Sequence, residues 1–301
     1  MINDSSTGGA GHRSRALVLG GGGPVGRAWE IGLVDGFAGQ GIDFWTADFI
    51  IGTSAGAVVG AQLALKQGFG APPKIAASPP VQSDLMADLA AAMVRAAQSP
   101  NPELIRAEIG KMALNAQTIS EEASVARSMF APFVGQPWPN QFRATAVNAR
   151  TGQLQIWDAS SGAPLERAIA ASTAAPGIWP PITINGERYI DGGMRSMLNA
   201  DLAIGSDIVI AVSCFPLTDK VGTPFFTTLN AAMLAELDAV RGSGAILTVI
   251  EPHSEFLMLT KHGTAMMDSN LVPEAYRLGR VTAGGRGGVG SPRLEFAIAG
   301  C

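Results

Sequence analysis

The chain is poor in the residues that build metal centres and disulfides. Its 301 residues include two cysteines, Cys214 and Cys301, and three histidines, His12, His253 and His262. Two cysteines exclude a disulfide framework and a cysteine-based metal site, and the histidines are too scattered to form a metal cluster. We therefore expect no metal site and no other cofactor.

Charged residues and long apolar runs are also scarce. Charged residues make up 15% of the chain and the net charge is −4, which excludes a basic field for nucleic acid. No apolar run reaches the roughly 18 residues that span a membrane. The polar residues 1–15 lack the apolar core of a signal peptide, so we expect a flexible leader. The composition predicts a cytoplasmic protein and leaves peripheral contact with a membrane open.

Small and apolar residues are abundant instead. Hydrophobic residues make up 47% of the chain, enough for a large core, and this length suits one α/β domain, which we expect over residues 16–301. Proline-rich stretches interrupt residues 68–140, where periodicity predicts helices. This region is expected to be a helical insertion that caps the active site or packs on the sheet. Periodicity predicts helices over 27–37, 84–98, 102–115 and 121–130, and strands over 16–19, 142–147, 154–157, 207–212 and 246–250.

A serine motif follows the apolar run Phe49–Ile51. The next residues are Gly52-Thr53-Ser54-Ala55-Gly56, and Ala-rich, helix-favouring sequence comes after them. This order of strand, sharp turn and helix is what a nucleophile elbow requires. Gly52 and Gly56 leave room for the turn, and the N-terminus of the following helix would stabilise an anion beside Ser54. Ser54 is therefore the candidate nucleophile.

A glycine-rich loop precedes this motif. Gly20-Gly21-Gly22-Gly23-Pro24-Val25-Gly26 separates an expected strand from an expected helix. Backbone N–H groups in such a loop can approach a negatively charged atom. If the two strands are neighbours in one parallel sheet, the N–H groups of Gly21, Gly22 and Gly23 form an oxyanion hole for Ser54.

The same loop also matches a nucleotide-binding pattern. Gly21, Gly23 and Gly26 have the G-x-G-x-x-G spacing of a phosphate loop. That interpretation needs an acidic residue about 20 residues further on to hold a ribose, which Asp43 or Asp48 could supply. A non-catalytic nucleotide-binding protein is therefore one alternative.

A third motif, Asp191-Gly192-Gly193, follows the strand-like residues Glu187–Ile190. The two glycines open space around the carboxylate, but an aspartate here can also simply cap a turn. Before it, the helix-like segment Ala170–Pro176 breaks into a proline-fixed loop. Taken alone, this motif does not make Asp191 catalytic.

Together the motifs resemble the patatin-like phospholipases, an acyl hydrolase family with a Ser–Asp dyad. The glycine loop, the Ser54 elbow, the Ala-Ala-Ser-x-Ala-Ala-Pro segment 170–176 and Asp191-Gly192-Gly193 occur in that family's order. One position departs from the pattern. The family often has Arg or Lys just before the last glycine of the loop, where this chain has Val25, with Arg27 after the glycine. This difference removes support for a functional role of a positively charged side chain in the loop, but it does not change the backbone amides.

The resemblance implies a three-layer α/β sandwich with a mostly parallel central sheet flanked by helices. It also implies Ser54 as nucleophile, Asp191 as general base and acid, and a phospholipid or another lipid acyl ester as substrate. Because an unperturbed aspartate has a pKa of about 3.9, we expect the site to desolvate Asp191 or to share the transition-state charge. The motif glycines around the dyad are Gly26, Gly52, Gly56, Gly192 and Gly193.

An α/β-hydrolase with a catalytic triad is the alternative among enzymes. The required order of Ser, Asp and His is available in Ser54, in Asp207 or Asp238, and in His253 or His262. Against this alternative, Leu19 rather than a histidine precedes the glycine run. Both histidines are expected in loops or at the surface.

Overall fold

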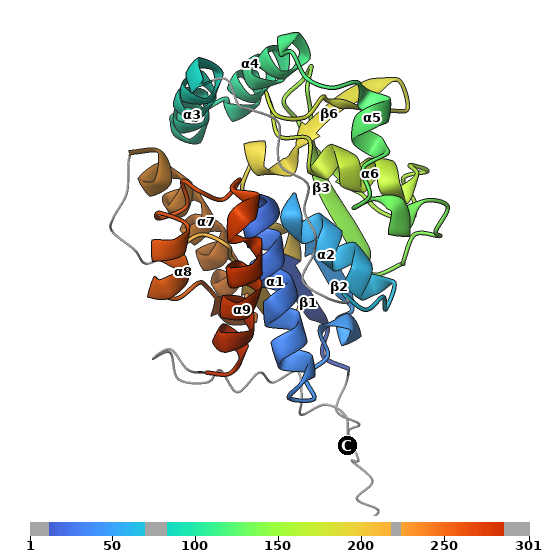
Figure 1. Cartoon of the computed structure of the whole chain (residues 1–301), viewed down its shortest axis with the longest axis vertical. Coiled ribbons are helices and arrows are strands. Elements are labelled where there is room, and N and C mark those ends of the chain that lie inside the picture. The colour runs from blue at the N-terminus through green and yellow to red at the C-terminus, as the bar shows by residue number, and fades with distance from the viewer. Residues whose placement is uncertain (1–11, 70–82, 218–223, 286–301) are drawn as a thin grey trace, which may run out of the picture.

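A computed structural model describes residues 12–69, 83–217 and 224–285 (Figure 1). Its centre is an eight-stranded sheet with the order β5-β6-β3-β2-β1-β7-β8, in which β4 also pairs with β3. The strands β3, β2, β1, β7 and β8 run parallel, and β4, β5 and β6 pair antiparallel. The strands are β1 (Arg15–Leu19), β2 (Phe49–Gly52), β3 (Phe142–Asn148), β4 (Leu154–Trp157), β5 (Ile182–Ile184), β6 (Glu187–Asp191), β7 (Ile208–Val212) and β8 (Ile246–Ile250).

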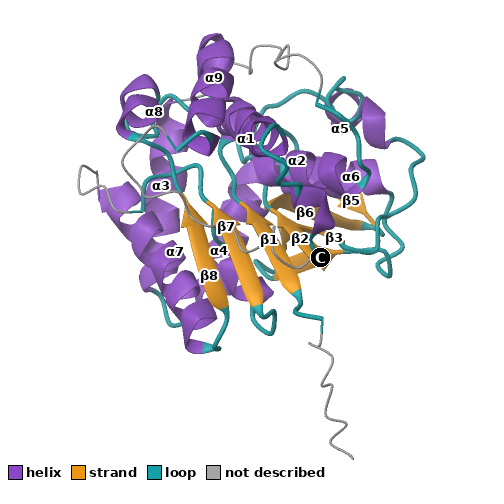
Figure 2. Ribbon diagram, turned by 90° about the horizontal axis from the view of Figure 1, so that it is seen from below, coloured by secondary structure: helices purple, strands orange, loops and turns teal. Residues whose placement is uncertain are grey.

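Helices cover both faces of this sheet. Figure 2 shows α1, α2 and α6 on one face and α4 and α7 on the other. The three-layer α/β fold with a mostly parallel sheet is therefore confirmed. The helices are α1 (Gly23–Ala38), α2 (Ala55–Ala64), α3 (Ser83–Gln98), α4 (Pro102–Asn115), α5 (Glu121–Val125), α6 (Leu165–Ser172), α7 (Pro224–Gly242), α8 (Ser254–Leu259) and α9 (Val272–Ala283).

Two predicted helices have different ends in the structure. α1 begins at Gly23 rather than at residue 27, so the last part of the glycine loop is the first turn of the helix. α5 ends at Val125, before its predicted end. The reason is local: the Ser124 carbonyl accepts hydrogen bonds from both the backbone N–H and the Nε of Arg127 (3.3 and 2.9 Å), which tightens the chain into a turn.

β2 and β6 pair with the same edge of β3, one beyond the other. Ala144 of β3 pairs with Gly52 of β2 on one side and with β4 on the other. Ala146 pairs with Asp191 of β6 on one side and again with β4 on the other. Because β4 occupies one edge, β2 and β6 must share the opposite edge. Two residues of strand span about 7 Å, so β6 delivers Asp191 just beyond the end of β2.

The insertion helices α3 and α4 belong to the second helical layer. Ile109 and Ala113 of α4 share a buried cluster with Val147 of β3 and Ile190 of β6, and α3 packs against α4 and α7. Of the two arrangements that the sequence allowed for this region, a cap over the active site or helices packed on the sheet, α3 and α4 have the second. A cap over the active site stays a prediction, part of which falls on residues 70–82, outside the described residues.

The end of the predicted leader is bound to the sheet. The backbone N–H and Oγ of Ser14 donate to Asp207 Oδ2 (2.7 and 2.9 Å). The N–H of Arg15, where β1 begins, donates to Asp48 Oδ2 (2.8 Å). The prediction of a flexible leader therefore applies only to residues 1–11, which lie outside the described residues.

α1 and α9 pack at close range through glycines. A Cβ at Gly32 would lie 2.0 Å from the carbonyl oxygen of Tyr276, and a Cβ at Gly279 would lie 2.0 Å from that of Trp29. The lack of side chains at both positions sets the distance between the two helices.

Replacing Gly279 with Val should push α9 away from α1. We expect the free energy of unfolding to fall by roughly 3 kcal/mol, because the added atoms overpack the interface. The matched control is Gly242→Val at the end of α7, where an added Cβ meets no atom within 4 Å. Urea denaturation of both variants and the wild type measures the difference, and equal stability of the two variants would contradict the interface described here.

Candidate active site

Ser54 occupies a sharp turn between β2 and α2. Its backbone has φ 53° and ψ −115°, a conformation that a residue with a side chain adopts only when its surroundings enforce it. The glycines of the motif permit the turn. A Cβ at Gly56 would lie 2.2 Å from the Leu19 carbonyl oxygen, and a Cβ at Gly52 would lie 2.5 Å from Ala57 Cα. The backbone therefore has the form of a nucleophile elbow.

Asp191 contacts Ser54 directly. Ser54 Oγ donates to Asp191 Oδ2 at 2.7 Å, and the N–H of Gly193 donates to Asp191 Oδ1 at 2.7 Å. The backbone N–H of Asp191 donates to the Ala174 carbonyl oxygen (3.0 Å). Both carboxylate oxygens thus have a donor, and the two residues that the sequence placed 137 positions apart meet at the C-terminal edge of the sheet.

Burial changes the acidity of this carboxyl group. Asp191 is only 4% exposed, and desolvation raises its pKa from 3.8 to about 7, against the lowering effect of the hydrogen bonds from Ser54 and Gly193. Desolvation disfavours the charged form of an acid, which makes the carboxylate a stronger base. The expectation that the site desolvates Asp191 agrees with this shift.

The glycine loop offers two of its three expected amides. The N–H of Gly21 donates to the Met197 carbonyl oxygen at 2.7 Å, so Gly21 is wrong as an oxyanion donor because its amide is already bonded. Within the described residues, no hydrogen bond uses the N–H of Gly22 or Gly23. These amides are two of the N-terminal donors that a helix leaves unpaired, here at the start of α1.

The rest of the first turn of α1 has no amide to offer. Pro24 has no N–H, the N–H of Val25 donates to the Met266 carbonyl oxygen (3.2 Å), and that of Gly26 donates to Gly22 (2.8 Å). The loop also lies beside the elbow, since a Cβ at Gly21 would lie 3.3 Å from Ser54 Cβ. Gly22 and Gly23 therefore remain as candidate donors next to Ser54.

The elbow itself adds a residue that sequence reasoning missed. Ser172, at the end of α6, accepts a hydrogen bond from the Ser54 N–H at its Oγ (2.9 Å). The next backbone N–H along the chain, that of Ala55 at the start of α2, has no partner among the described residues. Ser172 belongs to the motif 170–176, but the pattern of that motif does not indicate a hydrogen bond between Ser172 and the elbow.

A buried polar network lies behind the dyad. Thr53 Oγ1 lies 2.8 Å from Thr145 Oγ1 and accepts a hydrogen bond from Asn199 Nδ2 (3.0 Å). Arg195 donates to Asn199 Oδ1 (2.7 Å) and forms an ion pair with Asp201. These contacts join β2, β3 and the segment after Asp191 into one rigid support.

Asp207, Asp238 and His253, which the triad alternative requires, are not brought to Ser54. Ser54 Oγ donates to Asp191 and to no histidine. Asp207 is bonded to Ser14 at the N-terminal end of β7, at the opposite edge of the sheet, and Asp238 is exposed and paired with Arg241 on α7. His253 follows β8, three strands away from β2, or about 14 Å at normal strand spacing.

The acidic residues that the nucleotide-binding alternative requires do not lie near the glycine loop. Asp48 directly precedes β2 and accepts hydrogen bonds from Arg15 and His12. Asp43 precedes the short helical turn just before it. Both therefore lie at the N-terminal edge of the sheet, whereas the glycine loop follows the C-terminal end of β1.

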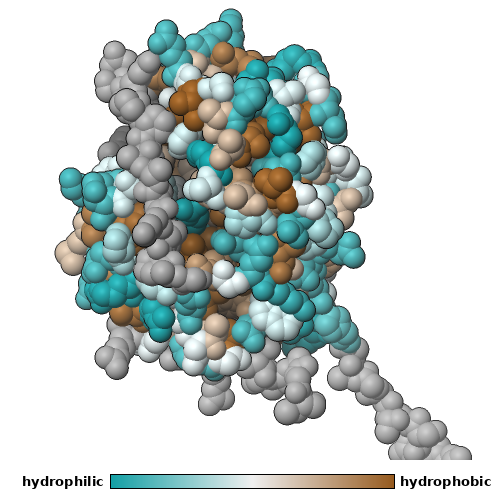
Figure 3. Space-filling view, turned by 45° about the vertical axis from the view of Figure 1, so that its right-hand side comes forward, coloured by the Kyte–Doolittle hydropathy of each residue, from teal (hydrophilic) through white to brown (hydrophobic). Residues whose placement is uncertain are grey.

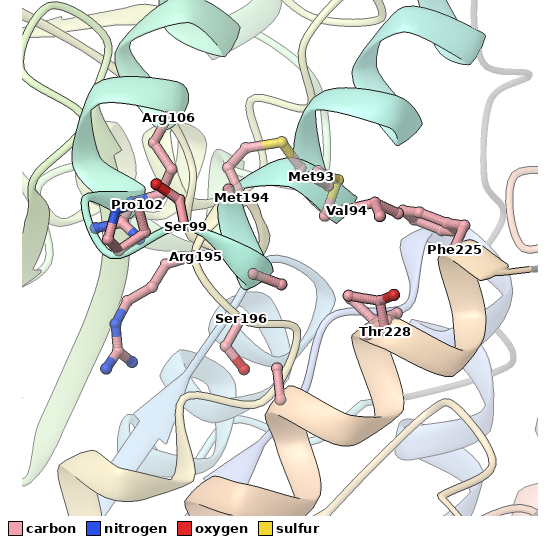
Figure 4. A pocket seen from close by; sticks show the side chains of 14 residues that line it. Met93, Val94, Ser99, Pro102, Arg106, Met194, Arg195, Ser196, Phe225 and Thr228 are labelled. Atoms are coloured by element: carbon pink, nitrogen blue, oxygen red, sulfur yellow. The ribbon is translucent and has the colours of Figure 1, made fainter.

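A cavity of about 190 Å³ opens beside the segment that follows Gly193. Met194 and Ser196 line one side, and Met93 of α3 and Phe225 of α7 line the others (Figure 4). Ser54 is not among its lining residues. Among the described residues, no three His, Cys, Asp or Glu side chains gather where they could hold a metal.

On the face drawn in Figure 3, the described residues form no single apolar region. In Figure 3, hydrophobic side chains are interspersed with hydrophilic ones over the face in view. The most exposed large apolar side chains, Leu104 of α4, Val134 and Met258 of α8, lie on separate segments. No helix within the described ranges has the length and apolar character needed to cross a membrane. Peripheral membrane contact stays a prediction.

An elbow serine bonded to a buried carboxylate at the C-terminal edge of a sheet is the geometry of a serine hydrolase site. Residues 81–204 match the family model described as patatin-like phospholipase, which confirms the resemblance seen in the sequence. The match supports a lipid acyl hydrolase. It includes Asp191 but neither Ser54 nor the glycine loop, which join the matched segment through the contacts described above. No curated protein matches the chain.

Solved structures show distant similarity. VipD from Legionella pneumophila matches with a TM-score of 0.42 and 11% identity, over 91% of this chain and 67% of VipD. The type III effector protein ExoU matches with a TM-score of 0.34 and 16% identity, over 89% of this chain and 54% of ExoU. At these scores the description of the fold depends on this chain's own strands and helices.

Asp191→Asn should stabilise the protein more at pH 8 than at pH 5. The folded-state pKa of about 7 lies above the ordinary value of 3.8, so the folded state binds the proton more tightly. The stability of the wild type should therefore fall as the pH rises from about 4 to about 7. At 1.4 kcal/mol per pKa unit, the fall is roughly 4 kcal/mol. The asparagine does not titrate and avoids this loss.

Urea denaturation at the two pH values measures the effect. The control is Asp238→Asn, which removes an exposed carboxylate from α7 and should show no comparable dependence. A stability difference between Asp191→Asn and the wild type that is equal at pH 5 and pH 8 would contradict the raised pKa.

Proposed function

We propose that the chain is a serine acyl hydrolase that cleaves carboxylic esters of phospholipids or other lipids through a Ser54–Asp191 dyad. The observation that carries the proposal is the 2.7 Å hydrogen bond from Ser54 Oγ to Asp191. It joins a hydroxyl on a strained turn to a carboxylate whose pKa is about 7. A general base is most effective when its pKa lies near the working pH.

In the first half of the reaction, Ser54 Oγ attacks the ester carbonyl carbon while Asp191 accepts the hydroxyl proton. The carbonyl oxygen becomes an oxyanion in a tetrahedral intermediate. When the intermediate collapses, the bond to the leaving alcohol breaks and Asp191 returns the proton to the alcohol oxygen. The acyl group is then bonded to Ser54 as an ester.

In the second half, water attacks the acyl group on Ser54. Asp191 takes a proton from the water, and the second tetrahedral intermediate collapses with the proton returning to Ser54 Oγ. The carboxylic acid leaves and the dyad is restored. Because no histidine takes part, the same carboxyl group transfers the proton in every step.

The oxyanion is stabilised by backbone amides at two helix N-termini. The unpaired N–H groups of Gly22 and Gly23 begin α1, and that of Ala55 begins α2. The positive end of each helix dipole favours negative charge at this point. Fixed donors of this kind need no reorganisation as charge develops.

The surroundings favour a lipid ester over a small polar ester. The cavity beside the segment that follows Gly193 has an apolar part formed by methionines, alanines, Leu229 and Phe225, and a polar part formed by Ser99, Ser196, Thr228, Arg106 and Arg195. Flexible apolar side chains such as those of its methionines suit an acyl chain. The family match likewise supports a lipid substrate.

The first test concerns the nucleophile and the base. Ser54→Ala should abolish hydrolysis of a short-chain aryl ester and covalent labelling by a fluorophosphonate probe, because the attacking hydroxyl is removed. Asp191→Asn should lower kcat to near background. His253→Ala and His262→Ala, singly and together, should keep kcat/KM within about threefold of the wild type, since neither histidine moves a proton.

Melting temperatures of all variants show whether each is folded. Labelling of a different serine in Ser54→Ala would refute the assignment of the nucleophile. A folded histidine variant as inactive as Ser54→Ala would establish a triad in place of the dyad.

The second test concerns the amides of the glycine loop. A Cβ at Gly23 would lie 2.7 Å from Met267 Sδ and 3.0 Å from the Met266 carbonyl oxygen. Gly23→Ala should therefore displace the loop and lower kcat by about 10²-fold, the effect of losing one oxyanion donor. KM should change little, because these bonds strengthen only in the transition state.

The matched control for the loop is Gly135→Ala. Gly135 also has a positive φ, of 69°, but an added Cβ there meets nothing within 4 Å. It therefore introduces the same backbone strain without a collision. A folded Gly23→Ala protein with the kcat of the control would remove the loop from the mechanism.

A further inference from the structure

The chain between β6 and β7 contacts several parts of the candidate site. We call residues 192–201, which directly follow Asp191, the bridging segment. The backbone N–H of Gly193 donates to Asp191 Oδ1 (2.7 Å), and the Met197 carbonyl oxygen accepts a hydrogen bond from the N–H of Gly21 (2.7 Å). The bridging segment is therefore bonded both to the carboxylate of the dyad and to the glycine loop.

The bridging segment also reaches the elbow, through Asn199. Asn199 Nδ2 donates to Thr53 Oγ1 (3.0 Å) and to the Ser196 carbonyl oxygen (2.7 Å), and Thr53 directly precedes Ser54. Asn199 is fully buried and has a left-handed backbone, with φ 55°, which asparagine adopts more readily than most residues with a side chain. A shift of the segment would therefore move the elbow, the carboxylate and the glycine loop together.

The centre of the bridging segment turns around one hydroxyl group. Ser196 Oγ accepts hydrogen bonds from the backbone N–H groups of Leu198 and Asn199 (both 3.1 Å). The hydroxyl in turn donates to Glu236 Oε2 (3.0 Å). Ser196 is only 2% exposed, and a buried donor without a partner is unfavourable. The direction of this hydroxyl therefore depends on Glu236.

Glu236 lies on α7, a helix that carries no group of the dyad. Its Oε2 also accepts a hydrogen bond from the backbone N–H of Ala200 (3.0 Å), where the next short helical turn begins. Its Oε1 lies 3.8 Å from Arg195 Nη1, and the side chain is 13% exposed. One carboxyl group therefore contacts the bridging segment at three positions along its length.

The ion pair of the bridging segment has a different effect. Arg195 Nη2 lies 2.6 Å from Asp201 Oδ2, and both residues belong to the segment. This pair shapes the segment but does not attach it to another element. Glu236 attaches it to α7, which covers the face of the sheet opposite α1 and α2 (Figure 2).

The bonds that Glu236 accepts do not require its charge. Burial, together with the nearby charge of Asp201, raises the pKa of Glu236 to about 7, against the lowering effects of the bonds from Ser196 and Ala200 and of the charge of Arg195. A protonated carboxyl group still has an oxygen that accepts hydrogen bonds, and so does the amide of a glutamine. Glutamine should therefore replace Glu236 at this position.

We propose that Glu236 is a positioning residue of the active site, which holds the bridging segment and, through it, the dyad and the glycine loop in the arrangement that ester hydrolysis requires. This inference rests on the proposed function. Within the described residues, no hydrogen bond joins Glu236 to Ser54 or Asp191, so Glu236 acts through Ser196 and Ala200. Its loss should therefore lower kcat and leave KM nearly unchanged, because the reacting groups are displaced while an ester can still bind.

The test compares Glu236→Leu, which removes both acceptor oxygens at similar size, with Glu236→Gln, which keeps one. The substrate is a short-chain aryl ester, whose acyl group is too small to fill the cavity beside the segment. Glu236→Leu should lower kcat by about 10- to 100-fold, the effect of displacing reacting groups by up to about 1 Å, with KM within about threefold of the wild type. Glu236→Gln should keep kcat within about threefold. The matched control is Asp238→Leu, which replaces an exposed acid of the same helix and should change neither constant.

Ser196→Ala tests the same path from its other end. It removes the hydroxyl that Glu236 binds, adds no atom that could collide, and should lower kcat by about tenfold at unchanged KM. If Glu236 acts through Ser196, the double variant of Ser196→Ala and Glu236→Leu should be at most about threefold slower than Glu236→Leu, because the effects of coupled residues do not add. The rate of fluorophosphonate labelling at Ser54 should fall in the same order as kcat, and melting temperatures show whether each variant is folded.

The outcomes separate this inference from the proposed function. A folded Glu236→Leu variant with the kcat of the wild type overturns the inference. A Glu236→Gln variant as slow as Glu236→Leu, a raised KM at unchanged kcat, or additive losses in the double variant also overturn it, and all of these leave the dyad intact. If Glu236→Leu does not fold, Ser196→Ala decides, since an unchanged kcat in that folded variant overturns the inference and a lowered kcat at constant KM supports it. A wild type that hydrolyses no ester and is not labelled at Ser54 refutes the proposed function, and this inference with it.

Discussion

Asp191 reaches Ser54 because β2 and β6 pair with the same edge of β3. The backbone, not a flexible side chain, sets the distance between the two groups, and a shift of β6 by one residue would turn Asp191 to the other face of the sheet. A dyad with direct contact tolerates no such shift, because no histidine can span the gap. Hydrogen bonds among Thr53, Thr145 and Asn199 connect the end of β2 to β3 and to the segment that follows β6.

Several features of the site are unfavourable for folding. Ser54 has a strained backbone, Asp191 is a buried acid, and the first amides of α1 are unpaired. Each lowers stability by of order 1–3 kcal/mol. The surrounding core offsets these losses: β1 and β7 are almost entirely buried, and α1 is clamped against α9. Most of helix α1 is tightly packed, but the first backbone N–H groups of the helix have no hydrogen-bond partner. The elbow is similar, because well-packed strands and helices hold a single strained residue, Ser54.

Much of this arrangement could be predicted from local pattern. The strands that carry the motifs and the Ser54 elbow followed from short motifs with strict backbone requirements, whereas the pairing with Asp191 followed only from the resemblance to a known family. What could not be predicted depended on partners distant in sequence. In the sequence the Gly21 amide is equivalent to those of Gly22 and Gly23, and only the structure shows that it donates to the Met197 carbonyl oxygen. Likewise, the motif that contains Ser172 does not indicate that Ser172 Oγ accepts a hydrogen bond from the Ser54 N–H.

The order of the strands along the chain also governs when the site can exist. β1, β2 and β3 are complete by residue 148, so the elbow can be built on neighbouring strands while synthesis continues. The edge of β3 that receives β6 stays open until residue 191 has been made, about 40 residues later, which takes several seconds at ordinary rates of synthesis. During that interval Ser54 has no base and is an ordinary alcohol. If Ser54 and Asp191 act as the proposed dyad, the nascent chain cannot hydrolyse esters until β6 docks on β3, a form of temporal control that needs no inhibitor and no cleavage.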